Sequence, residues 1–295
     1  IALLQRLSPK KELLRRIYVT TKDNKLVGYI NLDDLVLSKP DETLNKVLHA
    51  NELTVNVHED QEWVAKQMQH YGLMSVPVVD NNHYFLGVIT ADDIFDVITE
   101  ESSEDVYKMS AVQPMEYGYF ETPIWSLFWQ RGMWLVSLLL LQSLSSLIMS
   151  SFHELLDKNV ILTFFLTALI GTGGNAGNQS SAILIRGLAT GEINKQNGLW
   201  ALIREMSVSL ILSIFLVIVM FFRVYFYHPN FLIAIAVSLT LFFIVNLAIL
   251  LGSALPLIFE KLNIDPAHTA APFLATLMDI LGVLVYCFIA SKILG

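Results

Sequence analysis

Hydrophobic residues follow different patterns in the two halves of the chain. Up to about residue 110, apolar and polar residues alternate over short runs of strand and helix length. Beyond residue 130, long apolar runs dominate, and five of them approach or exceed the ~20 residues that a membrane-crossing helix needs: 133–151, 159–185, 205–222, 231–257 and 267–292. The pattern predicts an N-terminal α/β domain followed by an α-helical membrane domain with five transmembrane helices.

The N-terminal half contains an internal repeat. Residues 18–35 overlay residues 77–94 at a constant offset of 59, without a gap, and the acidic pair 33–34 falls on the acidic pair 92–93. Each copy is predicted to form a strand, a turn, a second strand and a helix that begins at the acidic pair, because Asp favours helix N-termini. Residues 60–80, between the copies, predict a helix followed by a strand.

Composition agrees with a membrane protein and narrows the function. The chain is 54% hydrophobic and 16% charged, whereas soluble domains have ~25% charged residues. Its net charge of -8 argues against nucleic acid as a partner, because nucleic-acid binding requires a basic surface. The sequence holds no Ser-His-Asp or His-Glu-x-x-His constellation, and the one cysteine, Cys287, lies in an apolar run. We therefore do not expect an enzyme.

One charged residue, Asp279, lies well inside a predicted span, with no basic residue at matching depth. A carboxylate at mid-bilayer costs ~2.5–3.5 kcal/mol on insertion scales. The second span contains the run GTGGNAGNQSS, residues 171–181, whose glycines permit close backbone approach and whose amides supply neutral oxygens. Because hard cations prefer oxygen ligands, the two features predict a cation path. A protonated Asp279 between helices and a tightly packed helix pair are the alternatives.

The segment 92–105 is strongly acidic. Positions 93, 96, 100 and 104 stack on one helical face, where like charges repel. Two interpretations stay open. The acids form a solvated helix face, or divalent cations bridge them to one another, to Asp60 and Glu62, or to a second copy of the chain.

Two parts of the sequence resemble known families. The repeat resembles a tandem pair of CBS domains, through Gly87, Thr90 and Asp93 and a weaker set in the first copy, where Gly28, Asn31 and Asp34 stand. Residues 171–192 and 265–282 resemble the two signature segments of the MgtE family of magnesium channels. The CBS pair, the acidic connector and the five spans also agree with that family.

The resemblance to the MgtE family implies a homodimer in the lipid bilayer, with a pore on the two-fold axis lined by the second and fifth helices. It implies hydrated Mg²⁺ at the Asp279 pair, near Ala275, Asn175, Gly174 and Glu205. It also implies closure by cytoplasmic Mg²⁺ bound at connector and CBS carboxylates. The regulatory set comprises Asp60, Glu62, Asp93, Asp96, Glu101, Glu104 and Asp105. ATP is a candidate ligand of the CBS pair, at Asp34 and Thr90.

These expectations divide the chain into a tandem CBS domain (1–98), an acidic connecting helix and linker (99–130) and a five-helix pore domain (131–295). Lys and Arg are more frequent in the inner connections if the N-terminal domain is cytoplasmic, which places the C-terminus outside an inner or plasma membrane. Members of the family usually begin with a helical acidic domain. We expect none in this chain, and therefore shallower magnesium sensing.

Two alternative functions stay open at the sequence level. The first is a secondary transporter or exchanger of divalent cations with the same fold. The second is a membrane-tethered, nucleotide-sensing CBS regulator whose helices serve as an anchor. The isolated charge of Asp279 argues against the second, because an anchor gains nothing from a carboxylate in the bilayer.

Overall fold

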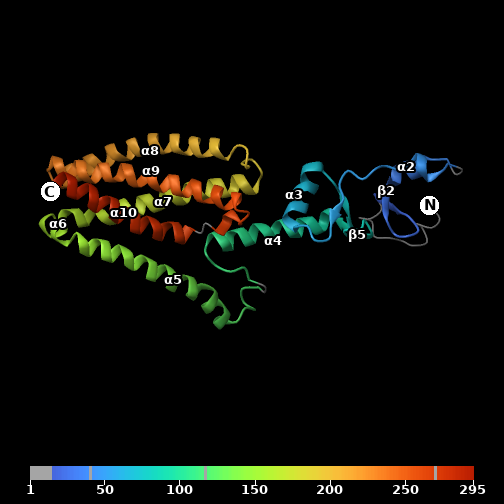
Figure 1. Ribbon diagram of the computed structural model, residues 1–295, viewed down its shortest axis with the longest axis horizontal. Helices are drawn as coiled ribbons and strands as arrows, with labels where there is room; N and C mark the ends of the chain where they lie inside the picture. The colour runs from blue at the N-terminus through green and yellow to red at the C-terminus, as the bar shows by residue number, and fades with distance from the viewer. Residues whose placement is uncertain (1–14, 40–41, 116–117, 269–270) are drawn as a thin grey trace. The chain divides into compact units, whose positions relative to one another are not determined.

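The computed structural model describes residues 15–39, 42–115, 118–268 and 271–295. The first fourteen residues of the predicted CBS pair, and two residues within the second signature segment, lie outside these ranges. The chain divides into two units, Ile1–Ser103 and Glu104–Gly295. The first mixes strands and helices and the second is helical, as Figure 1 shows, so the predicted fold class is confirmed.

The first unit contains two antiparallel strand pairs, one for each copy of the repeat. In the first copy, β1 (Arg16–Thr20) pairs with β2 (Leu26–Asn31), and α2 (Leu32–Leu37) follows. In the second copy, β4 (Ser75–Val79) pairs with β5 (Phe85–Thr90), and α4 (Ala91–Met109) follows. Between the copies lie η2 (Leu44–Lys46), β3 (Val55–Asn56), which runs parallel to β4, and α3 (Gln61–Tyr71).

The two copies meet at equivalent residues. The Leu26 N–H donates to the His83 carbonyl at 3.3 Å, and the Phe85 N–H donates to the Asn24 carbonyl at 2.9 Å. The offset of 59 relates both donors and both acceptors. Asn24 and His83 also share a left-handed backbone, with φ of 60° and 63°, which Asn and His tolerate better than most residues. The repeat seen in the sequence is therefore a local two-fold pseudosymmetry.

The core of the first unit lies beneath α3. Val64 and Met68 on α3 pack with Val55, Val76 and Ile94 from β3, β4 and α4. Helix α4 continues without a break through residue 98, the predicted end of the CBS domain. The division between the two units falls within α4, after Ser103.

The second unit consists of long helices that run back and forth (Figure 1). They are α5 (Ile124–Ser151), the short α6 (His153–Lys158), α7 (Ile161–Ala189), α8 (Gly198–Tyr227), α9 (Phe231–Lys261), the turn η3 (Pro266–His268) and α10 (Ala271–Leu294). Among the described residues, α5, α8, α9 and α10 are long and apolar enough to cross a membrane. Helix α7 has 29 residues, and its polar, glycine-rich centre lowers its hydropathy. The five long helices match the five predicted spans.

Helix α9 is the centre of the second unit, and α7, α8 and α10 pack around it. Its residues Ala234, Val237, Ile244 and Ala248 are fully buried, as expected for a helix that is hydrophobic on all sides. Helix α5 packs mainly against α10 and buries only Leu138. The remaining apolar surface of α5 therefore requires lipid or another protein surface.

Candidate functional site

Asp279 lies on α10, eight residues after the first residue of that helix. Its carboxylate accepts a hydrogen bond of 2.7 Å from the Gln142 side-chain amide of α5. Within the described residues no cation forms an ion pair with Asp279. Sequence reasoning missed Gln142. The available signal was a lone amide in the apolar run LLLLQSL.

The glycine run of α7 has two different faces. A Cβ at Gly173 would collide with Ile244, and one at Gly177 would lie 3.0 Å from the Ala248 carbonyl oxygen, so both glycines permit the close crossing of α9. A Cβ at Gly174 would meet no atom within 4 Å. Gly174 therefore leaves open space beside α7 in the single chain.

The other residues predicted near the ion path lie on three helices. Ala275 is one turn before Asp279 on α10, and Asn175 is exposed on α7. Glu205 on α8 accepts a hydrogen bond of 2.6 Å from the Ser180 hydroxyl of α7. On α7, the Asn178 side-chain oxygen is buried and has no hydrogen-bond donor among the described residues. Neutral and charged oxygens thus accompany the central helices without converging on one point in a single chain.

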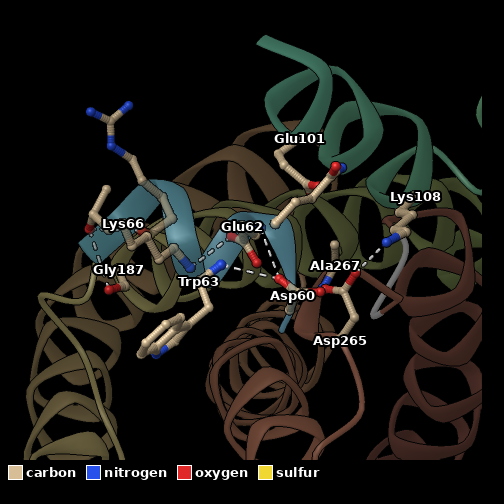
Figure 2. Close-up of polar contacts among 12 residues, drawn as sticks. Asp60, Glu62, Trp63, Lys66, Glu101, Lys108, Gly187, Asp265 and Ala267 are labelled. Carbon is tan, nitrogen blue, oxygen red and sulfur yellow. Dashed lines mark hydrogen bonds and ion pairs between the residues drawn. The ribbon is translucent and has the colours of Figure 1, made fainter. Parts of the chain in front are cut away.

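Three of the predicted regulatory carboxylates, Asp60, Glu62 and Glu101, have partners within the first unit (Figure 2). Asp60 is the N-cap of α3 and accepts from the backbone N–H groups of Glu62 and Trp63 at 2.9 and 3.1 Å. Glu62 forms an ion pair of 2.7 Å with Lys66. Glu101 accepts from the Gln61 amide at 2.7 Å. These contacts stabilise α3 and its neighbourhood.

On α4 the acids do not converge into a binding site. Asp93 accepts a hydrogen bond of 2.7 Å from the Thr90 hydroxyl, and Asp96 is exposed. Across the described ranges, no three or more His, Cys, Asp or Glu side chains lie close enough to hold a metal ion. A single copy of the chain therefore does not form a chelating site from Asp93, Asp96, Glu101, Glu104 and Asp105.

Lys108 joins α4 to the segment that precedes α10 (Figure 2). Its ammonium group bonds Asp265 at 2.6 Å and Glu104 at 2.5 Å. Asp265 also accepts from the Ala267 N–H at 2.9 Å. Burial favours a lower pKa for Lys108, but the two carboxylates raise it above its usual value. Burial likewise favours a higher pKa for Asp265, and the hydrogen bonds from Lys108 and Ala267 outweigh it and lower that pKa.

The Lys108–Asp265 contact predicts a pH-dependent contribution to stability. The Asp265 part is present above ~pH 4 and is lost as pH falls through the lowered pKa. The Lys108 part is present below ~pH 10.5 and is lost as pH rises through the raised pKa. Replacing Asp265 with Asn should lower the free energy of unfolding by about 1 kcal/mol at neutral pH. Thermal unfolding from pH 3 to 8 measures this difference.

The control is Glu42→Gln, which removes an exposed ion pair of 3.3 Å with Lys46 and should change stability by less than about 0.5 kcal/mol. An Asp265→Asn variant with wild-type stability at neutral pH would show that the Lys108–Asp265 contact does not hold α4 to the segment before α10.

The two candidate nucleotide contacts are engaged within the protein. Asp34 accepts hydrogen bonds from the Asn31 amide at 2.9 Å and from the His49 ring at 2.8 Å. These two hydrogen bonds, of which the one from Asn31 has the larger effect, lower the pKa of Asp34. Thr90 donates to Asp93 in the second copy. The pairs Asn31–Asp34 and Thr90–Asp93 are equivalent positions of the repeat. A ribose at either site would have to replace these internal bonds.

Comparisons with known proteins agree with this architecture. Residues 166–289 match the MgtE family, described as a divalent cation transporter, and residues 42–100 match the CBS domain. The magnesium transporter MgtE of Thermus thermophilus is 35% identical over 99% of this chain and 64% of its own length. The magnesium transporter MgtE of Bacillus subtilis is 32% identical over 95% of this chain and 62% of its own length. The chain thus spans less than two-thirds of these relatives.

A solved structure of the cytosolic domain of the Mg²⁺ channel MgtE in complex with ATP is 32% identical. It covers 32% of this chain and 39% of that one, with a TM-score of 0.31. The fold and the sequence matches together define a multi-pass membrane protein that carries CBS sequence in its N-terminal unit. The chain is thus similar to MgtE magnesium transporters over almost its whole length, and its residues 166–289 match the MgtE family.

Proposed function

We propose that two copies of this chain form a membrane pathway for magnesium. The observation that carries the proposal is the Asp279 carboxylate, which sits inside an apolar helix beside a neutral amide and without a cation partner among the described residues. Mg²⁺ loses its water reluctantly and is commonly held through that water by one or two carboxylates. Two Asp279 side chains related by a two-fold axis supply such a site. The names of the relatives from Thermus and Bacillus support magnesium as the cargo.

The neighbouring groups have supporting roles in this proposal. Gln142 donates to one carboxylate oxygen and orients Asp279, leaving the other oxygen for the water shell of the ion. The Ala275 carbonyl and the Asn175 amide add neutral oxygens along the path, and Gly174 keeps it free of side chains. Glu205 adds negative charge near the N-terminal end of α8, which begins at Gly198.

We place the N-terminal unit in the cytoplasm and the C-terminus outside the membrane. A channel and a secondary transporter fit this arrangement equally in a static structure. Electrical recording from planar bilayers containing the purified chain separates them. A channel gives unitary currents that reverse at the magnesium equilibrium potential. An electroneutral exchanger gives magnesium uptake without such currents, and the absence of both would contradict the proposal.

Cytoplasmic magnesium regulates the pathway in this proposal, through the acidic face of α4. Two carboxylates about 4 Å apart repel by ~1 kcal/mol in water and ~4 kcal/mol at an effective dielectric constant of 20. Divalent cations reduce that repulsion, by screening or by bridging the acids of two copies, and so favour a more compact state. Lys108 couples the end of α4 to the segment before α10 through Asp265. Magnesium at the acids can thereby bias the helix that carries Asp279.

Neutralising the acidic face should remove this regulation. The variant replaces Asp93, Asp96 and Asp105 with Asn, and Glu101 and Glu104 with Gln. Because both the repulsion and the cation attraction disappear, uptake should lose its dependence on cytoplasmic magnesium, whatever its absolute rate. The measurement is uptake as a function of magnesium on the CBS side. Glu154→Gln with Asp157→Asn, two exposed acids of α6, is the control. An unchanged midpoint and steepness in the five-site variant would place the sensor elsewhere.

Nucleotide sensing is a second, separable function of the CBS pair. The name of the ATP complex supports it as a candidate, while the internal bonds of Asp34 and Thr90 oppose it. Equilibrium dialysis with labelled ATP measures it directly. In the regulator alternative, ATP binding persists in a chain that carries no magnesium flux.

A further inference from the structure

An apolar groove of about 460 Å³ lies between α8 and α9, near the turn that joins them. That volume falls within the ~300–1,000 Å³ typical of small-molecule sites. Its walls include Ile214, Ile218 and Phe222 of α8, and Ile235, Leu239 and Phe242 of α9. Because the two helices are antiparallel, Ile214 lies at the level of Phe242, and Phe222 at the level of Ile235. The groove therefore follows the helix axes for roughly 12 Å at 1.5 Å per residue.

Ser238 is the single polar residue among those that line the groove. The residue is 3% exposed, and its hydroxyl is buried and has no hydrogen-bond partner in the described part of the chain. On the same helix, Thr240 and Ser253 bond the carbonyl four residues earlier, at 2.8 and 2.6 Å. The Ser238 hydroxyl is thus an exception on α9.

Polar side chains elsewhere between α8 and α9 find partners across the interface. Asn246 accepts from the Ser209 hydroxyl at 2.7 Å and donates to the Ser213 hydroxyl at 2.9 Å. Two turns away along α9, Ser238 lies at the groove, whose other lining residues are all apolar. An unpaired hydroxyl in an apolar environment costs free energy, and the hydrocarbon core contains no water to relieve it. An acceptor supplied by an occupant of the groove, once a side-chain rotation turns the hydroxyl toward it, would remove this cost.

The depth of Ser238 indicates what that acceptor is. Helix α9 has 31 residues, or ~46 Å at 1.5 Å per residue, and exceeds the ~30 Å hydrocarbon core by ~8 Å at each end if it is centred. Ser238 follows Phe231 by seven residues, or roughly 10 Å. It therefore lies just inside the hydrocarbon boundary, at the level where phospholipid ester carbonyls are found.

We propose that this groove binds one acyl chain of a membrane phospholipid, whose ester carbonyl accepts a hydrogen bond from the Ser238 hydroxyl. Ile214, Ile218 and Phe222 are each more than half exposed, so the groove is open along its side to the surrounding lipid. An acyl chain runs roughly parallel to the helices of a membrane protein and matches the direction of the groove. The site does not depend on magnesium transport, only on the membrane location of α8 and α9.

Photolabelling of the full chain tests this site. The purified protein is placed in phosphatidylcholine vesicles that contain a small fraction of the same lipid with a diazirine in one acyl chain. After illumination, labelled peptides are mapped, and label at 214–222 and 235–242 is expressed relative to label on α5. We expect clear enrichment at the groove. Ser238→Ala should reduce it about threefold to tenfold, the range for loss of one hydrogen bond.

Two further variants complete the experiment. Ser207→Ala removes an exposed hydroxyl of α8 that bonds its own helix at 2.8 Å, and should leave the labelling unchanged. Val217→Phe with Ile235→Phe fills the groove and should abolish the enrichment while the protein still elutes as a single species. Equal labelling of groove and α5, or insensitivity to Ser238→Ala, would overturn the proposal. So would disulfide crosslinking between two copies through Ile218→Cys in a Cys287→Ala background, because it would show that a second chain covers the groove.

Discussion

Replacing Asp279 with Ala is expected to reduce magnesium uptake by at least about a hundredfold while leaving the protein folded. A divalent ion held through one water layer near a carboxylate gains about 3 kcal/mol or more at an effective dielectric constant of 20. Each 1.4 kcal/mol corresponds to a factor of ten, so loss of the charge removes most of the occupancy of the site. Uptake into vesicles with a trapped magnesium-sensitive dye measures the effect.

Two variants distinguish charge from shape. Asp279→Asn keeps the size and one oxygen of the side chain but removes its charge, and should lose nearly as much uptake as Asp279→Ala. Gln142→Leu removes only the hydrogen-bond donor of 2.7 Å and should reduce uptake a few-fold, by about the worth of one hydrogen bond. A folded Asp279→Asn protein with wild-type uptake would refute the assignment of this carboxylate to the ion path.

Replacing Gly252 with Val should prevent stable packing of the membrane unit. A Cβ at Gly252 would collide with the Gly177 carbonyl oxygen, and backbone atoms on both sides cannot move aside as a flexible side chain would. Even Gly252→Ala should therefore cost about 1–3 kcal/mol, the usual penalty for overpacking. Thermal unfolding followed by size-exclusion chromatography measures both variants.

Gly174→Ala is the matched control, because a Cβ there meets open space. It should unfold at nearly the wild-type temperature and elute identically. Equal destabilisation by Gly174→Ala and Gly252→Ala would mean that α7 faces α9 through a different set of glycines. Gly174→Val then separates the two roles of the run, since a stable variant with blocked uptake places residue 174 on the ion path.

Much of this fold could be predicted from local patterns. The repeat predicted two equivalent strand pairs, and the offset of 59 relates the residues that pair across their interface, such as Lys25 with Tyr84. Apolar runs identified all five long helices, because a helix in lipid needs an apolar surface along its length. Asp279 stood out for the same reason, as a charge in such a run.

The helix ends were predicted less well. Helix α5 begins at Ile124 and α8 at Gly198, nine and seven residues before the predicted spans. A span defined by hydropathy stops at the first charged residue, which is Arg131 for α5 and Glu205 for α8. The backbone hydrogen bonds of each helix continue beyond the hydrocarbon core. The charged ends of these helices therefore belong to the interface with the head groups.

Contacts between distant segments could not be predicted at all. Lys108 and Asp265 are separated by 157 positions, and Gln142 and Asp279 by 137. Lys108, Asp265 and Gln142 each have an ordinary interpretation alone, as a solvated charge or a polar residue in a span, and nothing local in the sequence names the partner of Asp279. Likewise, Gly252 lies in an unremarkable apolar run, and only the crossing of α7 and α9 gives it a role. Such pairings depend on tertiary packing, which one sequence does not encode in any local pattern.

This chain itself is expected to provide a magnesium pathway. The most direct measurement is magnesium entry into sealed vesicles that contain only the purified wild-type chain, with an inside-negative potential and a trapped magnesium-sensitive dye. We expect rapid entry that saturates with external magnesium and is absent from protein-free vesicles. Vesicles that contain folded protein but take up no more magnesium than protein-free vesicles would contradict it.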